Sequence, residues 1–137
     1  MNKGARLARG EYCLFLNSGD ELCDTTALDR LTDFLGPDII VCNCKVMGAP
    51  VHKQVERTWA NKELGRMFFF NRTLLHQSVL IKRSVFERFG YYDAQFKIKG
   101  DHDFFARVCL RPDVSVLAVS ICLSRYYLDG ISSIEKN

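Results

Sequence analysis

The sequence predicts an α/β fold in one domain, with helices packed against a mostly parallel sheet. Its 137 residues are close to the most common size of a single domain. With 47% hydrophobic and 26% charged residues, the composition is that of an ordinary globular protein and excludes disorder as the main state. Apolar runs of strand length alternate along the chain with segments of helical periodicity, which favours a sheet covered by helices.

The first elements are expected to be the end of a helix and a short strand. Met1–Arg9 places small and apolar residues among bases, and Gly10 follows at the position where helices commonly end. Tyr12–Leu16 is an apolar run of strand length that stops at the polar segment Asn17–Asp20.

A helix and a buried strand come next. Thr25 or Thr26 can cap the helix, and Gly36 followed by Pro37 ends it. Its apolar residues recur at three- and four-residue spacing: Leu28, Leu31, Phe34 and Leu35. The run Asp38–Val46 is apolar enough to be a strand buried on both faces.

The rest of the chain predicts further helices and strands. We expect a weakly alternating edge strand or loop over Val51–Thr58, a helix over Asn61–Phe70 and a strand over Leu74–Ile81. Two helices, Ser84–Phe89 and Asp101–Leu110, and a last strand, Val114–Leu123, follow. Gly90 ends the first of the two helices.

The charges are unevenly distributed. The net charge of +3 is too small to indicate nucleic acid, but Asp20–Asp38 holds six acids and one base, whereas Lys45–Lys99 holds eleven bases and four acids. This asymmetry fits an anionic ligand held through a metal, or an anionic membrane surface. A solvated surface of mixed charge is the alternative.

The six cysteines are predicted to be reduced thiols in a cytoplasmic protein. The first residues carry no apolar segment of the kind found in secretory signals, and no run is long enough to span a membrane. The Cys42–Cys44 pair has the wrong spacing for a zinc site. Most of the cysteines lie in apolar runs, where a free thiol behaves as a small hydrophobe.

The turn Asn17–Asp20 is the first candidate site. It follows a predicted buried strand, and ligands of open α/β sheets bind at the carboxyl ends of strands. The Asp20 carboxylate is also a suitable ligand for a hard divalent cation that is shared with phosphates. The alternative is a turn closed by side-chain hydrogen bonds, with Gly19 at positive φ.

The segment Gly100–Asp103 is the second candidate. Asp101 opens a predicted helix and is either a cap or a general base. Residues two apart point to different sides of a helix, so Asp101 and Asp103 are not expected to share one site. His102 is either a metal ligand or a surface residue.

The strand that begins His76–Gln77–Ser78 is the third candidate. No nucleophile-elbow sequence surrounds Ser78, which argues against a hydrolase triad. The chain also lacks a glycine-rich phosphate loop of the Walker or Rossmann type.

Taken in order, three segments resemble the family 2 glycosyltransferases of the GT-A fold, in their bacterial polysaccharide-building branch. They are NKGARLARGEYCLFLNSGDEL, HQSVLIKRSVFERFGYYDAQFKIKGDHDFFARV and YYLDGISS. The resemblance implies inverting transfer of a sugar from a nucleotide donor to a carbohydrate or lipid-linked acceptor hydroxyl. It also implies a divalent metal, Mn²⁺ or Mg²⁺, and a place in the cytoplasm or peripherally at the inner membrane face.

The resemblance also implies roles for single residues. Asp101 matches the aspartate that accepts the acceptor proton. Asn17, Ser18, Gly19 and Asp20 match the family's Asp-x-Asp segment, with Asp20 as the metal ligand and the other three beside the donor. His76 and Gln77 match a strand that borders the donor sugar and its phosphates.

The resemblance further implies that the chain corresponds to the C-terminal two-thirds of a GT-A domain, without its N-terminal nucleotide-binding units. The sheet edge at Tyr12–Leu16 would then be open and would promote self-association. The competing interpretations are a non-catalytic binding or assembly module and, less favoured, a metal-dependent phosphoesterase.

Overall fold

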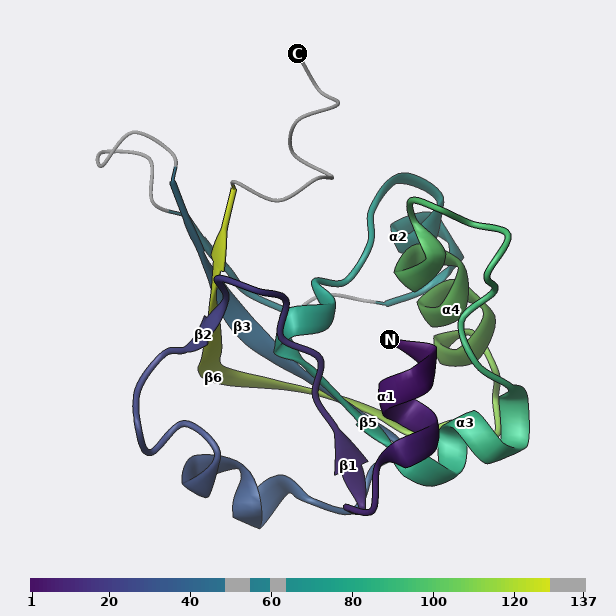
Figure 1. The fold of residues 1–137 in the computed structure, drawn as a ribbon, viewed down its shortest axis with the longest axis horizontal. Coiled ribbons are helices and arrows are strands. Elements are labelled where there is room, and N and C mark those ends of the chain that lie inside the picture. Colours follow the sequence, from purple (N-terminus) through teal and green to yellow (C-terminus); the bar gives the residue numbers. More distant parts are fainter. Residues whose placement is uncertain (49–54, 60–63, 129–137) are drawn as a thin grey trace.

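The computed structural model of the chain describes residues 1–48, 55–59 and 64–128. These residues form a mixed sheet with helices on both of its faces (Figure 1). Five strands lie side by side in the order β1 (Tyr12–Cys13), β5 (Val79–Lys82), β3 (Ile39–Met47), β6 (Val116–Tyr127) and β2 (Glu21–Leu22). A further strand, β4 (Val55–Arg57), pairs with β3.

The prediction of a mostly parallel sheet is wrong. Among the described strand pairs only β3 and β6 run parallel, whereas β1–β5, β3–β5, β2–β6 and β3–β4 are antiparallel. The apolar runs showed which segments are buried, but a buried strand has the same composition whichever way its neighbours run. Strand direction depends on where the intervening loops re-enter the sheet.

Four helices cover one face of the sheet: α1 (Asn2–Leu7), α2 (Arg66–Asn71), α3 (Arg83–Phe89) and α4 (Gly100–Cys109). The 3-10 helix η1 (Asp29–Phe34) covers the other face (Figure 1). Alternation along β3 separates the two cores: Ile39 and Val41 pack on the α-helical side, and Ile40 and Cys42 pack on the η1 side. β3 is therefore buried on both faces, as its apolar sequence predicts.

Several elements are shorter than the sequence predicts. α1 ends at Leu7 rather than near Gly10, and β1 has two residues instead of five. The segment predicted as an α-helix after Thr26 is the 3-10 helix η1, and Asp24 stabilises the turn before it by accepting hydrogen bonds from the backbone and hydroxyl of Thr26. A short 3-10 turn suits a connection that must return directly to the sheet.

The helices α3 and α4 confirm their predictions, with Gly90 ending α3 at a φ of 82°. The predicted strand Leu74–Ile81 begins instead with the 3-10 helix η3 (His76–Ser78) and continues as β5. The weakly alternating segment near Thr58 contains the edge strand β4, and α2 confirms part of the helix predicted over 61–70. Residues 51–54, 60–63 and 129–133, on which parts of the predicted elements and of the third family segment fall, lie outside the described residues.

One end of the sheet collects the candidate site residues. The strands β3 and β6 run parallel, and β1 runs in the same direction because both β1 and β3 are antiparallel to β5. The turn after β1 therefore points toward the end where β3 and β6 finish. η3, which precedes the antiparallel β5, lies at that same end (Figure 1). Among the described residues no helix is long and apolar enough to cross a membrane.

Candidate active site

Buried polar side chains gather toward the carboxyl end of β3 and β6. In the described part of the chain the buried polar residues are Asn43, Gln77, Ser78 and Ser124, from β3, η3 and β6. The Ser78 and Ser124 hydroxyls are hydrogen bonded at 2.6 Å. Asn43 donates to Glu56 at 3.0 Å and accepts the backbone N–H of Trp59. The buried side chains at this end of the sheet therefore include polar ones, in contrast to the apolar core.

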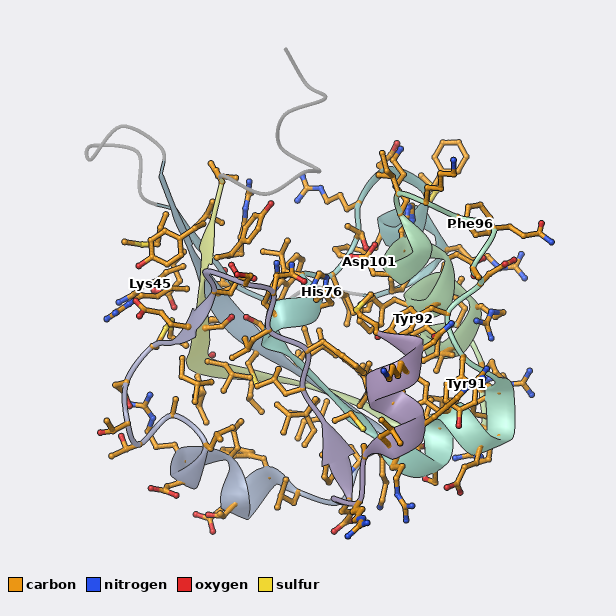
Figure 2. The ribbon with its side chains drawn as sticks, in the orientation of Figure 1. Lys45, His76, Tyr91, Tyr92, Phe96 and Asp101 are labelled. Carbon is orange, nitrogen blue, oxygen red and sulfur yellow. A yellow bond between two sulfur atoms is a disulfide. The ribbon has the colours of Figure 1, made fainter. Side chains whose placement is uncertain are left out.

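His76 and Asp101 form a contact close to these buried polar side chains. The Nδ1 atom of His76, from η3, lies 3.2 Å from Oδ2 of Asp101, in the first turn of α4 (Figure 2). The two side chains are 14% and 23% exposed, so they are largely shielded but reachable from solvent. Because a carboxylate only accepts, the Nδ1 atom carries the proton in this pair. The structure thus joins two residues that the sequence placed in separate candidate segments.

The environment of Asp101 keeps it ionised. Burial raises the pKa of its carboxyl group, but the hydrogen bond and charge of His76 and the backbone N–H of His102, at 2.9 Å, outweigh burial and lower the pKa below its ordinary value. Asp101 is therefore a carboxylate at neutral pH, free to accept a proton. Its ionised form stabilises the fold at neutral pH, and this contribution is lost as the pH falls through the lowered pKa.

Three buried polar atoms at this site have no protein partner among the described residues. They are Nε2 of His76, Oε1 of Gln77 and the hydroxyl of Tyr92. Burial, followed by the negative charge of Asp101, raises the pKa of Tyr92, so its hydroxyl stays protonated. Buried polar groups are nearly always hydrogen bonded in proteins. Unpartnered atoms around one ionised carboxylate are therefore suited to a polar ligand.

Tyr92 is held in place by α1. The Asn2 side chain donates to the Tyr92 carbonyl at 2.8 Å and accepts its backbone N–H at 3.0 Å. The Phe15 ring packs edge-on against Tyr92 with 5.9 Å between ring centroids. Tyr92 and Asn43 were not identified from the sequence. Asn43 could have been identified, because it is an amide inside an apolar run. Nothing in the local sequence distinguishes Tyr92 from its neighbour Tyr91.

The neighbours of Asp101 on α4 serve other purposes. Asp103 forms an ion pair with Arg107 one turn later, which confirms that Asp101 and Asp103 do not share a site. His102 is half-buried and its Nε2 atom is hydrogen bonded to the Phe69 carbonyl at the end of α2. It therefore joins α2 to α4, a structural role that was not predicted from the sequence.

The turn Asn17–Asp20 is closed on itself. Asp20 Oδ2 accepts the Asn17 backbone N–H at 3.3 Å, the Asp20 N–H returns to the Asn17 carbonyl at 3.0 Å, and Gly19 has a φ of +94°. The other carboxylate oxygen accepts the Tyr127 N–H at 3.2 Å. None of the hydrogen bonds of Asp20 goes to His76 or Asp101. The structure therefore shows the turn that was considered as the alternative for this segment.

The residues of this turn fit a divalent cation only as part of a shared site. In the described residues no cluster of three or more His, Cys, Asp or Glu side chains could hold a metal. Asp20 supplies one carboxylate, whose oxygens accept one N–H each and keep lone pairs for a cation. Mg²⁺ and similar ions often use one or two carboxylates and complete their coordination with phosphate oxygens and water.

The prediction that all six cysteines are free thiols is wrong for two of them. Cys23, just after β2, is disulfide bonded to Cys122 in β6, while Cys13, Cys42, Cys44 and Cys109 are free. Only the pairing of β2 with β6 brings the two sulfurs together, across 99 residues of sequence. Burial raises the pKa of Cys42 and of Cys109 to about 12, which makes both inert.

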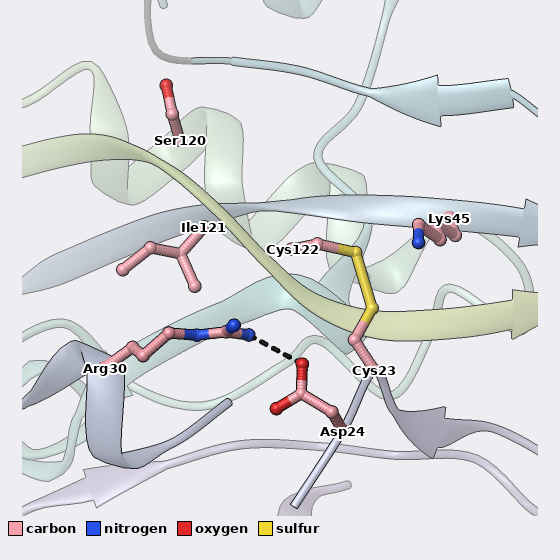
Figure 3. Close-up of a pocket in the computed structure, with 7 residues that line it drawn as sticks. All are labelled: Cys23, Asp24, Arg30, Lys45, Ser120, Ile121 and Cys122. Atoms are coloured by element: carbon pink, nitrogen blue, oxygen red, sulfur yellow. Dashed lines mark hydrogen bonds and ion pairs between the residues drawn. A yellow bond between two sulfur atoms is a disulfide. The ribbon is translucent and has the colours of Figure 1, made fainter. Parts of the chain in front are cut away.

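A hollow of about 300 Å³ lies beside this disulfide (Figure 3). Its polar lining includes Asp24, Arg30 and Lys45, but the Arg30 guanidinium is already paired with the Asp24 carboxylate at 2.8 Å. The hollow does not include His76 or Asp101 and has no unpartnered buried polar atom in its lining. We therefore place the candidate site at His76 and Asp101 and not here.

Comparison with solved structures identifies the class of fold. Over 99% of its length the chain superimposes on part of S. aureus TarS 1–349 in complex with UDP-GlcNAc, with a TM-score of 0.71 and 12% identity, covering 40% of that chain. The UDP complex of TarS gives a TM-score of 0.66 at 15% identity, over 92% of this chain and 38% of TarS. The chain therefore has the fold of part of TarS.

Curated sequences identify its relatives. The PGL/p-HBAD biosynthesis glycosyltransferases of Mycobacterium bovis and Mycobacterium tuberculosis are 27% identical over 130 residues, which cover 92% of this chain and 48% of theirs. No protein-family model matches the sequence. The chain is thus a distant homologue of glycosyltransferases over most of its length, and it spans about half the length of the curated relatives that it matches.

Proposed function

We propose that the protein takes part in the inverting transfer of a sugar from a nucleoside-diphosphate donor to an acceptor hydroxyl during surface polysaccharide assembly. The observation that carries the proposal is the His76–Asp101 pair, an ionised and shielded carboxylate at the carboxyl end of the sheet. The homology to glycosyltransferases supports the reaction class. TarS, whose fold the chain shares in part, was solved with UDP and with UDP-GlcNAc, which supports a UDP-sugar as donor.

In this proposal Asp101 is the general base. Its carboxylate accepts the proton of the acceptor hydroxyl while the acceptor oxygen forms a bond to the anomeric carbon. The bond between that carbon and the diphosphate oxygen breaks on the opposite face, and the diphosphate leaves with the electron pair. One displacement of this kind inverts the anomeric configuration. The residue needs no prior deprotonation, because its lowered pKa keeps it ionised at neutral pH.

His76 and Gln77 have complementary tasks. The Nδ1 atom of His76 orients Asp101, and its Nε2 atom and the Oε1 atom of Gln77 have no protein partner among the described residues. Both atoms can accept hydrogen bonds, so we assign them to hydroxyl groups of the donor. Asn17, Ser18, Gly19 and Asp20 would lie beside the diphosphate, with Asp20 holding Mn²⁺ or Mg²⁺. Such an ion, when bound, neutralises the charge that develops on the leaving phosphate.

The proposal also covers the extent of the domain, its self-association and its place of action. In this proposal residues 1–137 are the C-terminal two-thirds of a GT-A domain; coverage of 38% of TarS and 48% of the mycobacterial relatives supports a match to part of larger proteins. β1 pairs with β5 alone among the described strands, which supports strand pairing or self-association at this edge. Light scattering tests the self-association. The proposed place of action is the cytoplasm, peripherally at the inner membrane face.

The test is calorimetric titration with UDP, GDP and CDP, each with and without Mn²⁺. We expect UDP to bind best, and Mn²⁺ to strengthen binding in the wild type but not in Asp20→Ala. Asp33→Ala is the matched control, because Asp33 is an exposed acid of η1. Nucleotide binding that is equal in the wild type and in Asp20→Ala, with and without Mn²⁺, would overturn the proposal. Nucleotide binding without any sugar transfer would favour the non-catalytic binding module instead.

A further inference from the structure

An exposed apolar patch lies close to the start of α4. Met67 and Phe70 on α2 are 78% and 82% exposed, which makes them the most exposed large hydrophobic side chains in the described residues. Phe96 and Ile98, in the segment that leads into α4, are 50% and 42% exposed. Figure 2 shows Phe96 at the outer rim of the molecule, pointing away from the sheet. We call these four residues the outer patch.

The two segments of the outer patch are joined by specific contacts. His102, in the first turn of α4, is hydrogen bonded to the Phe69 carbonyl of α2. Phe69 is buried in the core beneath and so anchors α2, which leaves the flanking Met67 and Phe70 outside. Phe96 packs beside Gly100 at the start of α4. Both segments of the patch therefore lie against the first turn of α4, which also carries Asp101.

The outer patch is accompanied by bases. Arg66 and Arg72 flank α2, and Lys97 and Lys99 lie between and after the exposed apolar residues of the second segment. All four are exposed, and none forms an ion pair with a described acid. The segments 66–72 and 96–99 contain no acid at all.

Among the described residues, the acids closest to the patch in sequence are engaged elsewhere. Asp93 accepts the backbone N–H of Gln95, and Asp103 pairs with Arg107. Asp101 bonds to His76, beneath the patch. Among the described residues, the four bases beside the hydrophobic side chains are therefore not neutralised by an ion pair.

We propose that the outer patch is the surface by which the protein docks on an anionic lipid bilayer. Apolar and aromatic side chains among Lys and Arg are typical of segments that lie in the membrane interface. The bases are attracted to acidic headgroups, and the hydrophobic side chains enter the boundary with the acyl chains. A protein partner is the less favoured occupant, because protein–protein interfaces are depleted in Lys.

Docking in this orientation has a consequence for the reaction. The patch ends at Lys99, two residues before Asp101, so docking would bring the start of α4 close to the membrane surface. An acceptor attached to a lipid would then be held on the side of the molecule that carries this helix start. This consequence alone rests on the proposed function, since docking itself needs no transfer reaction.

The test is co-sedimentation with vesicles of phosphatidylcholine, with and without phosphatidylglycerol, at low and high salt. We expect binding to the anionic vesicles that weakens as salt rises. The variant Phe70→Ser/Lys97→Ser is expected to lose at least tenfold in binding, because the base alone is worth roughly fivefold at an anionic surface. Neither residue has a described contact that the fold requires.

The matched control is Leu7→Ser/Arg9→Ser, which removes one exposed hydrophobic residue and one exposed base from α1 and the residues after it. It is expected to bind the anionic vesicles like the wild type. Absence of vesicle binding, or equal losses in the two variants, would overturn the proposal; the first outcome would leave a protein as the occupant. UDP titration of Phe70→Ser/Lys97→Ser is expected to match the wild type, so a failure of docking is distinguished from a failure of donor binding.

Discussion

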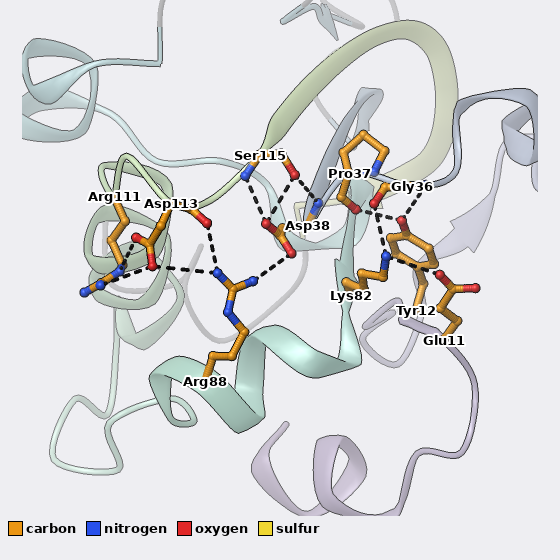
Figure 4. A network of polar contacts seen from close by, with 10 residues as sticks. All are labelled: Glu11, Tyr12, Gly36, Pro37, Asp38, Lys82, Arg88, Arg111, Asp113 and Ser115. Carbon is orange, nitrogen blue, oxygen red and sulfur yellow. Dashed lines mark hydrogen bonds and ion pairs between the residues drawn. The ribbon is translucent and has the colours of Figure 1, made fainter.

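The two ends of the sheet differ in how completely their polar groups are bonded. At the end where β3 and β6 begin, Asp38 accepts the Ser115 backbone N–H at 3.0 Å and the Arg88 guanidinium at 3.0 Å (Figure 4). The Asp38 N–H donates in return to the Ser115 hydroxyl at 2.9 Å. Arg88 also donates to the Asp113 carbonyl at 2.9 Å. These contacts tie α3 and the starts of both parallel strands together.

A second cluster closes the same end near β1. The Tyr12 hydroxyl donates to the Pro37 carbonyl at 2.7 Å and accepts the Gly36 N–H at 2.8 Å (Figure 4). Lys82 donates to the Gly36 carbonyl at 3.1 Å and pairs with Glu11 at 3.4 Å. Each of these side chains has a protein partner.

At the opposite end of the sheet, the hydrogen bonding of the buried polar groups is incomplete. Nε2 of His76, Oε1 of Gln77 and the Tyr92 hydroxyl are buried without a partner among the described residues. Unpaired buried polar atoms cost free energy, so they persist where a ligand completes them. The comparison shows that polar groups are fully bonded where the parallel strands begin and incompletely bonded at their carboxyl end, which is where we propose that the ligand binds. Substitutions at the two ends should therefore affect different measurements.

The largest expected effect is the loss of sugar transfer in Asp101→Asn. The amide keeps the size of the side chain but cannot accept the proton, so the transfer rate should fall by about 10²–10⁴-fold. Nucleotide affinity should stay within threefold of wild type. Asp103→Asn is the control, because Asp103 faces Arg107 on another side of α4. Transfer by Asp101→Asn within threefold of wild type would remove the proposed role.

At the other end, Asp38→Ala should act on stability alone. It removes the acceptor of the Arg88 guanidinium and of two groups of Ser115, and the side chain is only 15% exposed. We expect the free energy of unfolding to fall by about 2–3 kcal/mol in urea denaturation. Asp113→Ala, at a more exposed carboxylate of the same network, should cost less. A change in UDP affinity without a change in the unfolding midpoint would break the comparison.

The smallest of the three effects is expected for His76→Gln. Glutamine can still donate to Asp101 but not in the geometry of the imidazole, so transfer should slow by roughly tenfold. Loss of the His76 contact removes an interaction that lowers the pKa of Asp101, while burial continues to raise it. The acid limb of the pH–rate profile should therefore move to higher pH. An unshifted acid limb would show that His76 does not position Asp101.

Part of the candidate site was predictable because its signals are local. The apolar run of β3, the period of α4 and the polar residues at His76, Gln77 and Asp101 can all be recognised within short windows. The resemblance to glycosyltransferases was likewise carried by continuous segments, and the curated relatives support it. Each of these features depends on side chains that are neighbours in the sequence.

Strand direction, the disulfide and the pairing within the site were decided only by the tertiary structure. Cys23 meets Cys122 because β2 adds to β6, and His76 meets Asp101 because η3 and the start of α4 converge at one end of the sheet. These partners are 99 and 25 residues apart. The sequence by itself determined which segments are buried and which residues are candidates for a functional site, since burial, helical period and side-chain type are local properties. Which of those residues touch was decided by long-range packing, because periodicity contains no information about the direction or order of strands.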